Sequence, residues 1–255
     1  MTVEKLCLKA DVQLALKQRA ENICQEIETR EQIVKAFVST IGLRERLDAQ
    51  LEMLEQKYGS GAELPSLWGT TIGVKDVFFT DTLATRAGYW LPTDAIKGER
   101  SIVVSQLLNA GAILLGKTAC SEFGYQKAAN TCNPLYPHYS PGGSSSGSAA
   151  AVAAGFCDLG VGSQSRAGVT LPSAFCGVNG FTASAGRISK QGMFHLSQSL
   201  EQIGLFAKDM KVIKHAAKVL LLKGATTPEA ALDMRFGIPS RSFLALAEPQ
   251  IIAQF

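Results

Sequence analysis

PGGSSSGSAAAVAAGFCDLGVGSQSRAGVTLPSAFCGV occupies residues 141–178 and combines two glycine-rich loops with a run of alanines. Glycine and serine fill residues 142–148, and these residue types allow unusual backbone angles and bring N–H and hydroxyl groups close to a ligand. We predict that Ala149–Ala154 form a short, tightly packed helix that Gly155 ends. A second turn-rich loop covers residues 160–168. Two polar loops that flank one compact helix are typical of a binding or catalytic site.

On either side of this stretch, strand-like and helix-like patterns alternate along the chain. We predict strands over residues 70–77, 112–115 and 235–239, helices over 101–110 and 209–222, and the start of a helix over 245–255. This alternation favours an α/β fold with a mixed, largely parallel central sheet flanked by helices.

The first part of the chain has a helical pattern of its own. Apolar residues recur at helical spacing over 11–30 and 43–58, with charged residues between them. We predict an N-terminal helical segment, residues 1–62, packed on a core domain formed by residues 63–255. A coiled-coil partner helix is the alternative, and packing on the core is favoured over it.

Composition and charge exclude several classes of protein. The 255 residues are 46% hydrophobic and 18% charged, which is typical of a globular protein with a sizeable core. A net charge of +3 without a basic tract argues against a nucleic-acid partner. We see neither a signal-peptide pattern at the start nor an apolar run long enough for a membrane span, so we expect a cytoplasmic protein with no membrane partner.

Cysteine and histidine spacing gives no metal or redox motif. The six cysteines form no CxxC pair, so we predict free, buried thiols in a reducing compartment and no cofactor or metal. The three histidines lie far apart, and a Ser–His–Asp triad is not favoured. Residues 111–118 match the phosphate-loop pattern GxxxxGK[ST], but their central Ala-Ile-Leu-Leu favours a strand over a flexible loop, which argues against nucleotide binding.

Several ordered blocks resemble the amidase-signature enzymes, serine hydrolases that cleave amide C–N bonds. The blocks are GVKD at 73–76, LGKT at 115–118, GGSSSGSAAAVAAG at 142–155, GSQS at 162–165, LPSAFCGVNG at 171–180, GRI at 186–188 and SLEQIGLFA at 199–207. The resemblance covers most of the chain and corresponds to roughly the N-terminal half of a family member. It implies an amidase-signature core that is incomplete at its C-terminal side.

The resemblance also implies a Ser–Ser–Lys relay. In the family a nucleophilic serine attacks the amide carbonyl, and a second serine, on a cis peptide bond, passes its proton to a neutral buried lysine. The lysine corresponds to Lys75 and the bridging serine to Ser144. A hydroxyl needs an adjacent base at neutral pH, and a lysine becomes that base only where burial lowers its pKa.

The position of the nucleophile falls on Gly168. Its neighbours Arg166 and Ala167 also depart from the family pattern, as does Leu171, where the family commonly has arginine. Glycine has no side chain, so no acyl-enzyme can form at residue 168. The family's oxyanion hole uses backbone N–H groups of this loop, which correspond to Ser165, Arg166, Ala167 and Gly168.

The resemblance implies a small-molecule amide as the substrate, and we predict that Ser145, Gln164 and Phe123 contact it. Two functions stay open. One is an amide hydrolase with impaired or no activity. A variant of it would use Ser144 or Ser165 as a replacement nucleophile, and Ser144 would then form a Ser–Lys dyad with Lys75. The other is a non-catalytic amide-binding or partner-subunit protein. A homo-oligomer or a complementing subunit would supply the rest of the pocket.

Overall fold

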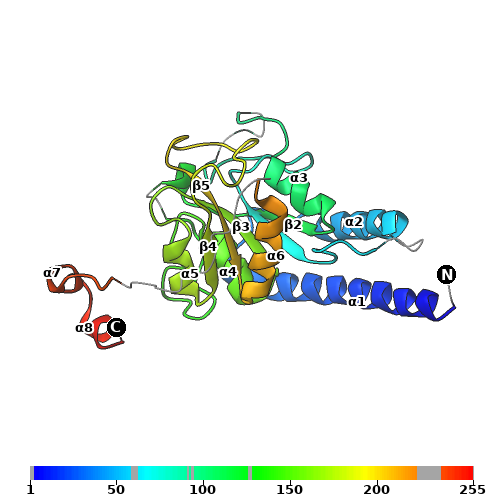
Figure 1. Ribbon diagram of the computed structural model, residues 1–255, viewed down its shortest axis with the longest axis horizontal. Coiled ribbons are helices and arrows are strands. Elements are labelled where there is room, and N and C mark those ends of the chain that lie inside the picture. Colours follow the sequence, from blue (N-terminus) through cyan, green and yellow to red (C-terminus); the bar gives the residue numbers. More distant parts are fainter. Residues whose placement is uncertain are drawn as a thin grey trace. The chain divides into compact units, whose positions relative to one another are not determined.

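The computed structural model describes residues 3–58, 63–90, 92, 95–125, 128–222 and 237–254 (Figure 1). The chain forms two compact units, Met1–Lys223 and Gly224–Phe255. The first contains α1 (Val3–Val34), α2 (Leu43–Tyr58), β1 (Thr71–Lys75), α3 (Ile102–Asn109), β2 (Ile113–Thr118), the 3-10 turn η1 (Glu122–Gly124), α4 (Ser146–Ala154), β3 (Leu159–Gln164), α5 (Thr170–Cys176), β4 (Asn179–Thr182), β5 (Gln202–Ala207) and α6 (Met210–Leu220). The second contains α7 (Arg241–Leu244) and α8 (Pro249–Gln254).

One mixed sheet of five strands organises the first unit, in the order β2-β1-β3-β5-β4. Strand β1 pairs in parallel with β2 and with β3, whereas β5 pairs antiparallel with β3 and β4. The fold is therefore α/β with a mixed central sheet flanked by helices, as predicted. Because β1 and β3 are parallel neighbours, Lys75 and Gln164 at their carboxyl ends lie at the same end of the sheet.

Helices cover both faces of this sheet. Adjacent residues of a strand point to opposite faces, and Leu205 and Phe206 accordingly belong to different apolar clusters. The Leu205 cluster contains the buried residues of α3 and α6, and the Phe206 cluster contains those of α1, α2 and α4. The predicted N-terminal helices thus pack on the sheet face that also holds α4, while the boundary at residue 62 stays a prediction.

Helix α4 confirms the prediction made from the alanine run. All of its residues except Ala153 are buried. A Cβ at Gly147 would lie 2.2 Å from the carbonyl oxygen of Ala36, so this close approach of two backbones requires glycine. Gly155 ends the helix in the left-handed conformation, with φ of 82°.

The other predicted elements of the first unit are also present. Helix α3 and strand β2 match the predictions over 101–110 and 112–115, although β2 extends further, to Thr118. Strand β1 falls within the predicted 70–77 and helix α6 within 209–222. The Asp209 carboxylate accepts a hydrogen bond from the backbone N–H of Lys211 at 2.8 Å and caps α6.

The predictions for the end of the chain hold less well. Residues 235–236 lie outside the described part, and residues 237–240 form no strand, so the prediction of a strand over 235–239 is wrong where it can be examined. A strand needs a partner for its N–H and C=O groups, and none of the described strands pairs with these residues. The predicted helix over 245–255 corresponds to α8, which begins at Pro249.

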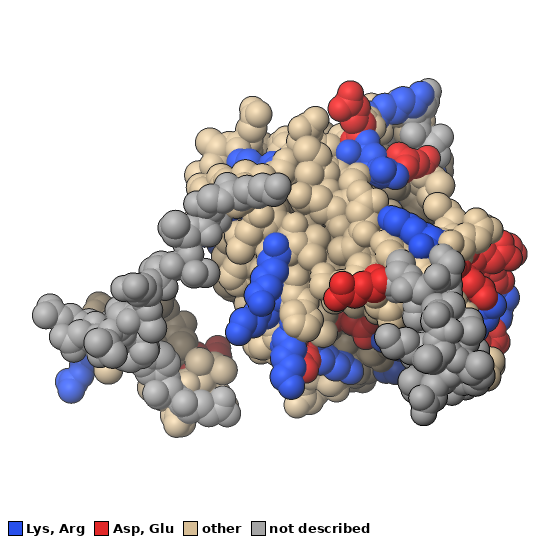
Figure 2. All heavy atoms as spheres, turned by 45° about the vertical axis from the view of Figure 1, so that its right-hand side comes forward, with Lys and Arg blue, Asp and Glu red and all other residues tan. Residues whose placement is uncertain are grey.

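Charged side chains are interspersed on the face that Figure 2 shows, with lysine and arginine beside aspartate and glutamate. Four cysteines of the described part are buried and free, namely Cys24, Cys120, Cys157 and Cys176, and Cys132 is free and partly exposed. The described residues include no helix with the length and apolarity of a membrane span. They also include no cluster of three metal-ligating side chains.

Candidate active site

Lys75 lies at the carboxyl end of β1 and is completely buried. Its Nζ lies 2.8 Å from the Oγ of Ser144, in the loop before α4, and 3.0 Å from the Oγ of Ser163 in β3. Three segments far apart in the sequence therefore bring one amine and two hydroxyls together. The structure unites the lysine and the bridging serine that the resemblance assigned.

Burial sets the protonation state of this amine. Loss of hydration lowers the pKa of Lys75, and the nearby thiol of Cys120 and carboxylate of Glu201 only partly oppose this effect. Burial in turn raises the pKa of Cys120 to about 12, so this thiol stays neutral at neutral pH. The amine is therefore held toward its neutral form, in which it can accept a proton from Ser144.

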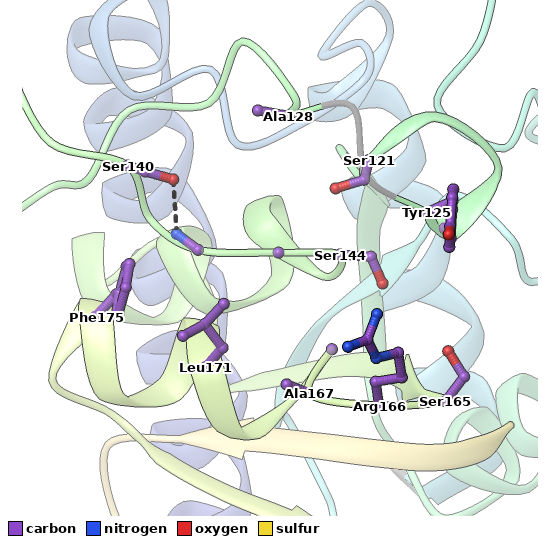
Figure 3. Close-up of a pocket in the computed structure, with 14 residues that line it drawn as sticks. Ser121, Tyr125, Ala128, Ser140, Ser144, Ser165, Arg166, Ala167, Leu171 and Phe175 are labelled. Atoms are coloured by element: carbon purple, nitrogen blue, oxygen red, sulfur yellow. Dashed lines mark hydrogen bonds between the residues drawn. The ribbon is translucent and has the colours of Figure 1, made fainter. Parts of the chain in front are cut away.

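Ser144 connects the amine to an open cavity. The Gly143–Ser144 peptide bond is cis, as the resemblance implies for the bridging serine. The cavity has a volume of about 400 Å³, and Ser121, Ser140, Ser144, Ser165, Tyr125 and Phe175 are among the residues that line it (Figure 3). Ser144 thus has its hydroxyl at the amine and belongs to the cavity wall, which is the placement that a proton carrier needs.

Gly168, where the resemblance leads us to expect the nucleophile, lies beside Ser144. A Cβ built on Gly168 would lie 2.9 Å from the Oγ of Ser144 and 2.6 Å from the carbonyl oxygen of Ser163. The carbonyl of Gly168 accepts a hydrogen bond from the backbone N–H of Ser145 at 3.3 Å. Residue 168 is therefore held next to the Ser144 hydroxyl, and a side chain at this position would require the Ser163 carbonyl or the loop itself to shift.

The loop over residues 165–168 forms one side of the cavity. Ser165, Arg166, Ala167 and Gly168 all line it. Within the described chain, none of their backbone N–H groups has a protein acceptor. The Arg166 side chain is exposed, and Figure 3 shows its guanidinium directed toward the Ser144 hydroxyl. The cavity wall at this loop therefore carries one positive charge, and an oxyanion hole formed by the loop stays a prediction.

The three residues predicted to contact substrate lie outside the cavity wall. Ser145 is fully buried, and its Oγ donates to the carbonyl of Ser163 at 3.2 Å. The side-chain oxygen of Gln164 accepts from the backbone N–H of Val169 at 2.9 Å. Phe123 stacks on Tyr89, with ring centroids 5.4 Å apart. These contacts hold the framework of the site, and a direct contact with substrate stays a prediction.

Two residues near the amine are not among those predicted from the sequence. The Oγ of Ser163, which accepts from the Nζ of Lys75, also donates to the Oε1 of Glu201 at 3.3 Å. Glu201 is buried, and its Oε2 accepts from the backbone N–H of Leu196 at 3.1 Å. Ser163 belongs to the GSQS block and Glu201 to the resembling stretch SLEQIGLFA at 199–207, but the resemblance gave neither residue a role.

The stretch that matches the phosphate-loop pattern forms a strand, and its lysine makes a buried ion pair. Gly116, Lys117 and Thr118 belong to strand β2 and not to a loop. The Nζ of Lys117 lies 3.1 Å from the Oδ1 of Asp76 and donates to the Oγ1 of Thr85 at 2.7 Å. Lys117 and Asp76 are both buried, so this ion pair has a structural role in the interior of the fold.

The fold and this arrangement of lysine, serines and cavity define an amide-hydrolase-like scaffold. A protein-family model described as Amidase matches residues 19–233. The chain therefore belongs to the amidase family.

Relatives support this assignment. The chain is 33% identical over 232 residues to a glutamyl-tRNA(Gln) amidotransferase subunit from Synechococcus sp. (strain RCC307), covering 89% of this chain and 47% of the relative. A solved structure described as a vestigial protein complex that reveals the evolutionary origins of an s-triazine catabolic enzyme superposes with a TM-score of 0.78 at 27% identity, covering 89% of this chain and 51% of that one.

A third comparison concerns the fold alone. The native peptide amidase from Stenotrophomonas maltophilia superposes with a TM-score of 0.73 at 24% identity, covering 88% of this chain and 50% of that one. The chain thus spans about half the length of the relatives it matches.

Proposed function

We propose that this protein binds a small-molecule amide at the cavity and has impaired or no hydrolytic activity, because it keeps a proton acceptor and a proton carrier without the usual nucleophile. The single observation that carries the proposal is the position of Gly168. Its missing Cβ would lie 2.9 Å from the Oγ of Ser144, so the residue at the end of the Lys75–Ser144 relay has no atom that can bond to a carbonyl carbon.

The rest of the site retains binding capacity. The residues of the 165–168 loop line the cavity and their N–H groups have no acceptor among the described residues, which supports a role as donors to an oxyanion. Serine proteases that lack a triad member keep a small acceleration from binding and from the oxyanion hole. A similarly small residual hydrolytic activity is the most that we expect of this protein.

A second candidate function uses Ser144 itself as the nucleophile. The contact of 2.8 Å between Ser144 Oγ and Lys75 Nζ, together with the place of Ser144 in the cavity wall, supports a Ser–Lys dyad. Ser165 also lines the cavity, but it makes no hydrogen bond with Lys75 in the described structure. The dyad is therefore the better of the two variant mechanisms.

Partners and compartment follow from the same reasoning. The relative from Synechococcus is named as one subunit of an amidotransferase, and we propose that a complementing chain or a second copy completes the cavity wall of this protein. The buried free thiols support a reducing compartment, and we propose the cytoplasm.

Turnover of a panel of primary and secondary amides tests the proposal, with Lys75→Ala as the control. We expect no turnover by the wild-type chain above that of the Lys75→Ala variant. Turnover that Lys75→Ala abolishes would overturn the inactive assignment. Loss of that turnover in Ser144→Ala, with retention in Ser165→Ala, would assign it to the dyad.

A further inference from the structure

Charge is distributed unevenly over the cavity wall. Among the described residues that line it, Arg166 is the only one with a formal charge, and the rest are serine, glycine, alanine, tyrosine, leucine and phenylalanine. No carboxylate of the described residues belongs to this wall. The cavity therefore attracts an anion, and it offers a cationic ligand no partner.

The guanidinium of Arg166 has no other partner in the part of the chain that the structure describes. Within the described residues it forms neither an ion pair nor a hydrogen bond, whereas Arg19, Arg30, Arg44 and Arg100 all pair with carboxylates. Figure 3 shows it pointing across the cavity and not away from it. An arginine fork of this kind matches the two oxygens of a carboxylate.

The rest of the cavity restricts the ligand further. Tyr125, Leu171 and Phe175 supply apolar wall, and each is exposed by 40% or more of its surface. A volume of about 400 Å³ is enough for a small organic molecule. The N–H groups of residues 165–168 add donors beside the arginine. An acid with an aromatic or aliphatic body fits all three features.

We propose that this cavity binds a small monocarboxylate with an apolar body, held through the Arg166 guanidinium. The inference deepens the proposed function and rests on it, because it names the class of ligand for the same cavity. In a ligand that carries a carboxylate and an amide, the carboxylate pairs with Arg166 and the amide faces Ser144.

Titration of phenylacetate and of its neutral isostere phenylacetamide, followed by NMR, tests the proposal. We expect the wild-type chain to bind phenylacetate more tightly than phenylacetamide, and added salt to weaken only phenylacetate binding. Arg166→Gln should weaken phenylacetate binding roughly tenfold to a hundredfold, the effect of a charge-assisted hydrogen bond, and leave phenylacetamide binding unchanged. Arg100→Gln, which removes the same charge outside the cavity, is the matched control and should change neither.

Each other outcome overturns the inference. Equal phenylacetate affinity in wild type and Arg166→Gln would show that the guanidinium is not the contact. Tighter binding of phenylacetamide would indicate a neutral-amide site and leave the proposed function intact. Inorganic phosphate that binds as tightly as phenylacetate would show that the cavity binds anions in general and does not select a carboxylate. Failure of both probes to bind would refute ligand binding here without bearing on whether a serine can be acylated.

Discussion

Substitution of Gly168 by alanine measures how closely the backbone surrounds the vacant nucleophile position. The added Cβ would lie 2.6 Å from the carbonyl oxygen of Ser163 and 2.9 Å from Ser144 Oγ, closer than a Cβ can approach either atom. Overpacking costs about 1–3 kcal/mol, and the lower entropy of the unfolded alanine chain offsets about 0.4–1 kcal/mol of it. We therefore expect Gly168→Ala to lower the free energy of unfolding by roughly 1–2 kcal/mol.

Thermal and urea unfolding measure this loss, at about 2–4 °C of melting temperature per kcal/mol for a chain of this size. Gly237→Ala is the matched control, because a Cβ there would meet nothing within 4 Å. It should not lower the stability of the chain and should raise it by at most about 1 kcal/mol, because only the entropy effect acts there. Gly168→Ala at or above wild-type stability would refute the view that the loop is closed around residue 168.

The same geometry bears on restoring the nucleophile. Gly168→Ser introduces the same Cβ, so the loop must move before the new hydroxyl can reach a substrate. We expect Gly168→Ser alone to be folded but less stable, with little or no gain in amide turnover. A gain would appear only where Arg166 and Ala167 are also replaced by glycine, because glycine widens the choice of backbone angles in the turn.

Three further predictions follow from buried groups. Lys75 binds a proton more weakly in the folded than in the unfolded chain, so the free energy of unfolding should rise with pH from the lowered pKa of Lys75 up to the ordinary lysine pKa of about 10.4, and less steeply in Lys75→Met, as followed by urea unfolding; an equal slope would contradict this. Lys117→Met should lower the free energy of unfolding in urea by about 3–5 kcal/mol, because it leaves the buried Asp76 carboxylate without its cation, and the double variant with Asp76→Asn should recover part of this loss. A Lys117→Met variant as stable as the wild type would refute the pairing. Iodoacetamide at pH 8 should label Cys132 before Cys120, as peptide mass spectrometry would show, because burial raises the pKa of Cys120 to about 12.

Much of the fold was predictable because its signals are local. The alanine run and Gly155 predicted α4, and apolar spacing predicted α2, α3 and α6. The predicted strand over 235–239 is absent at residues 237–239, where the run contains Gly237 and Pro239, two residue types that are depleted in strands.

The site was predictable to a different extent. Lys75 and Ser144 came from motif blocks, and the structure brings their side chains to 2.8 Å. Ser163 and Glu201 were missed because their roles depend on side-chain contacts with Lys75 and with each other, which form only in three dimensions. The resemblance located residue 168, whereas the lack of space around it became visible only in three dimensions.

Intact-mass spectrometry after exposure to a fluorophosphonate probe tests the central claim most directly. The claim is that Lys75 and Ser144 form a proton relay that ends at a residue without a nucleophile. We predict that the mass of the wild-type chain stays unchanged. A single adduct on Ser144 or Ser165 that disappears in Lys75→Ala would contradict the claim and show that a serine of the cavity has taken over the attack.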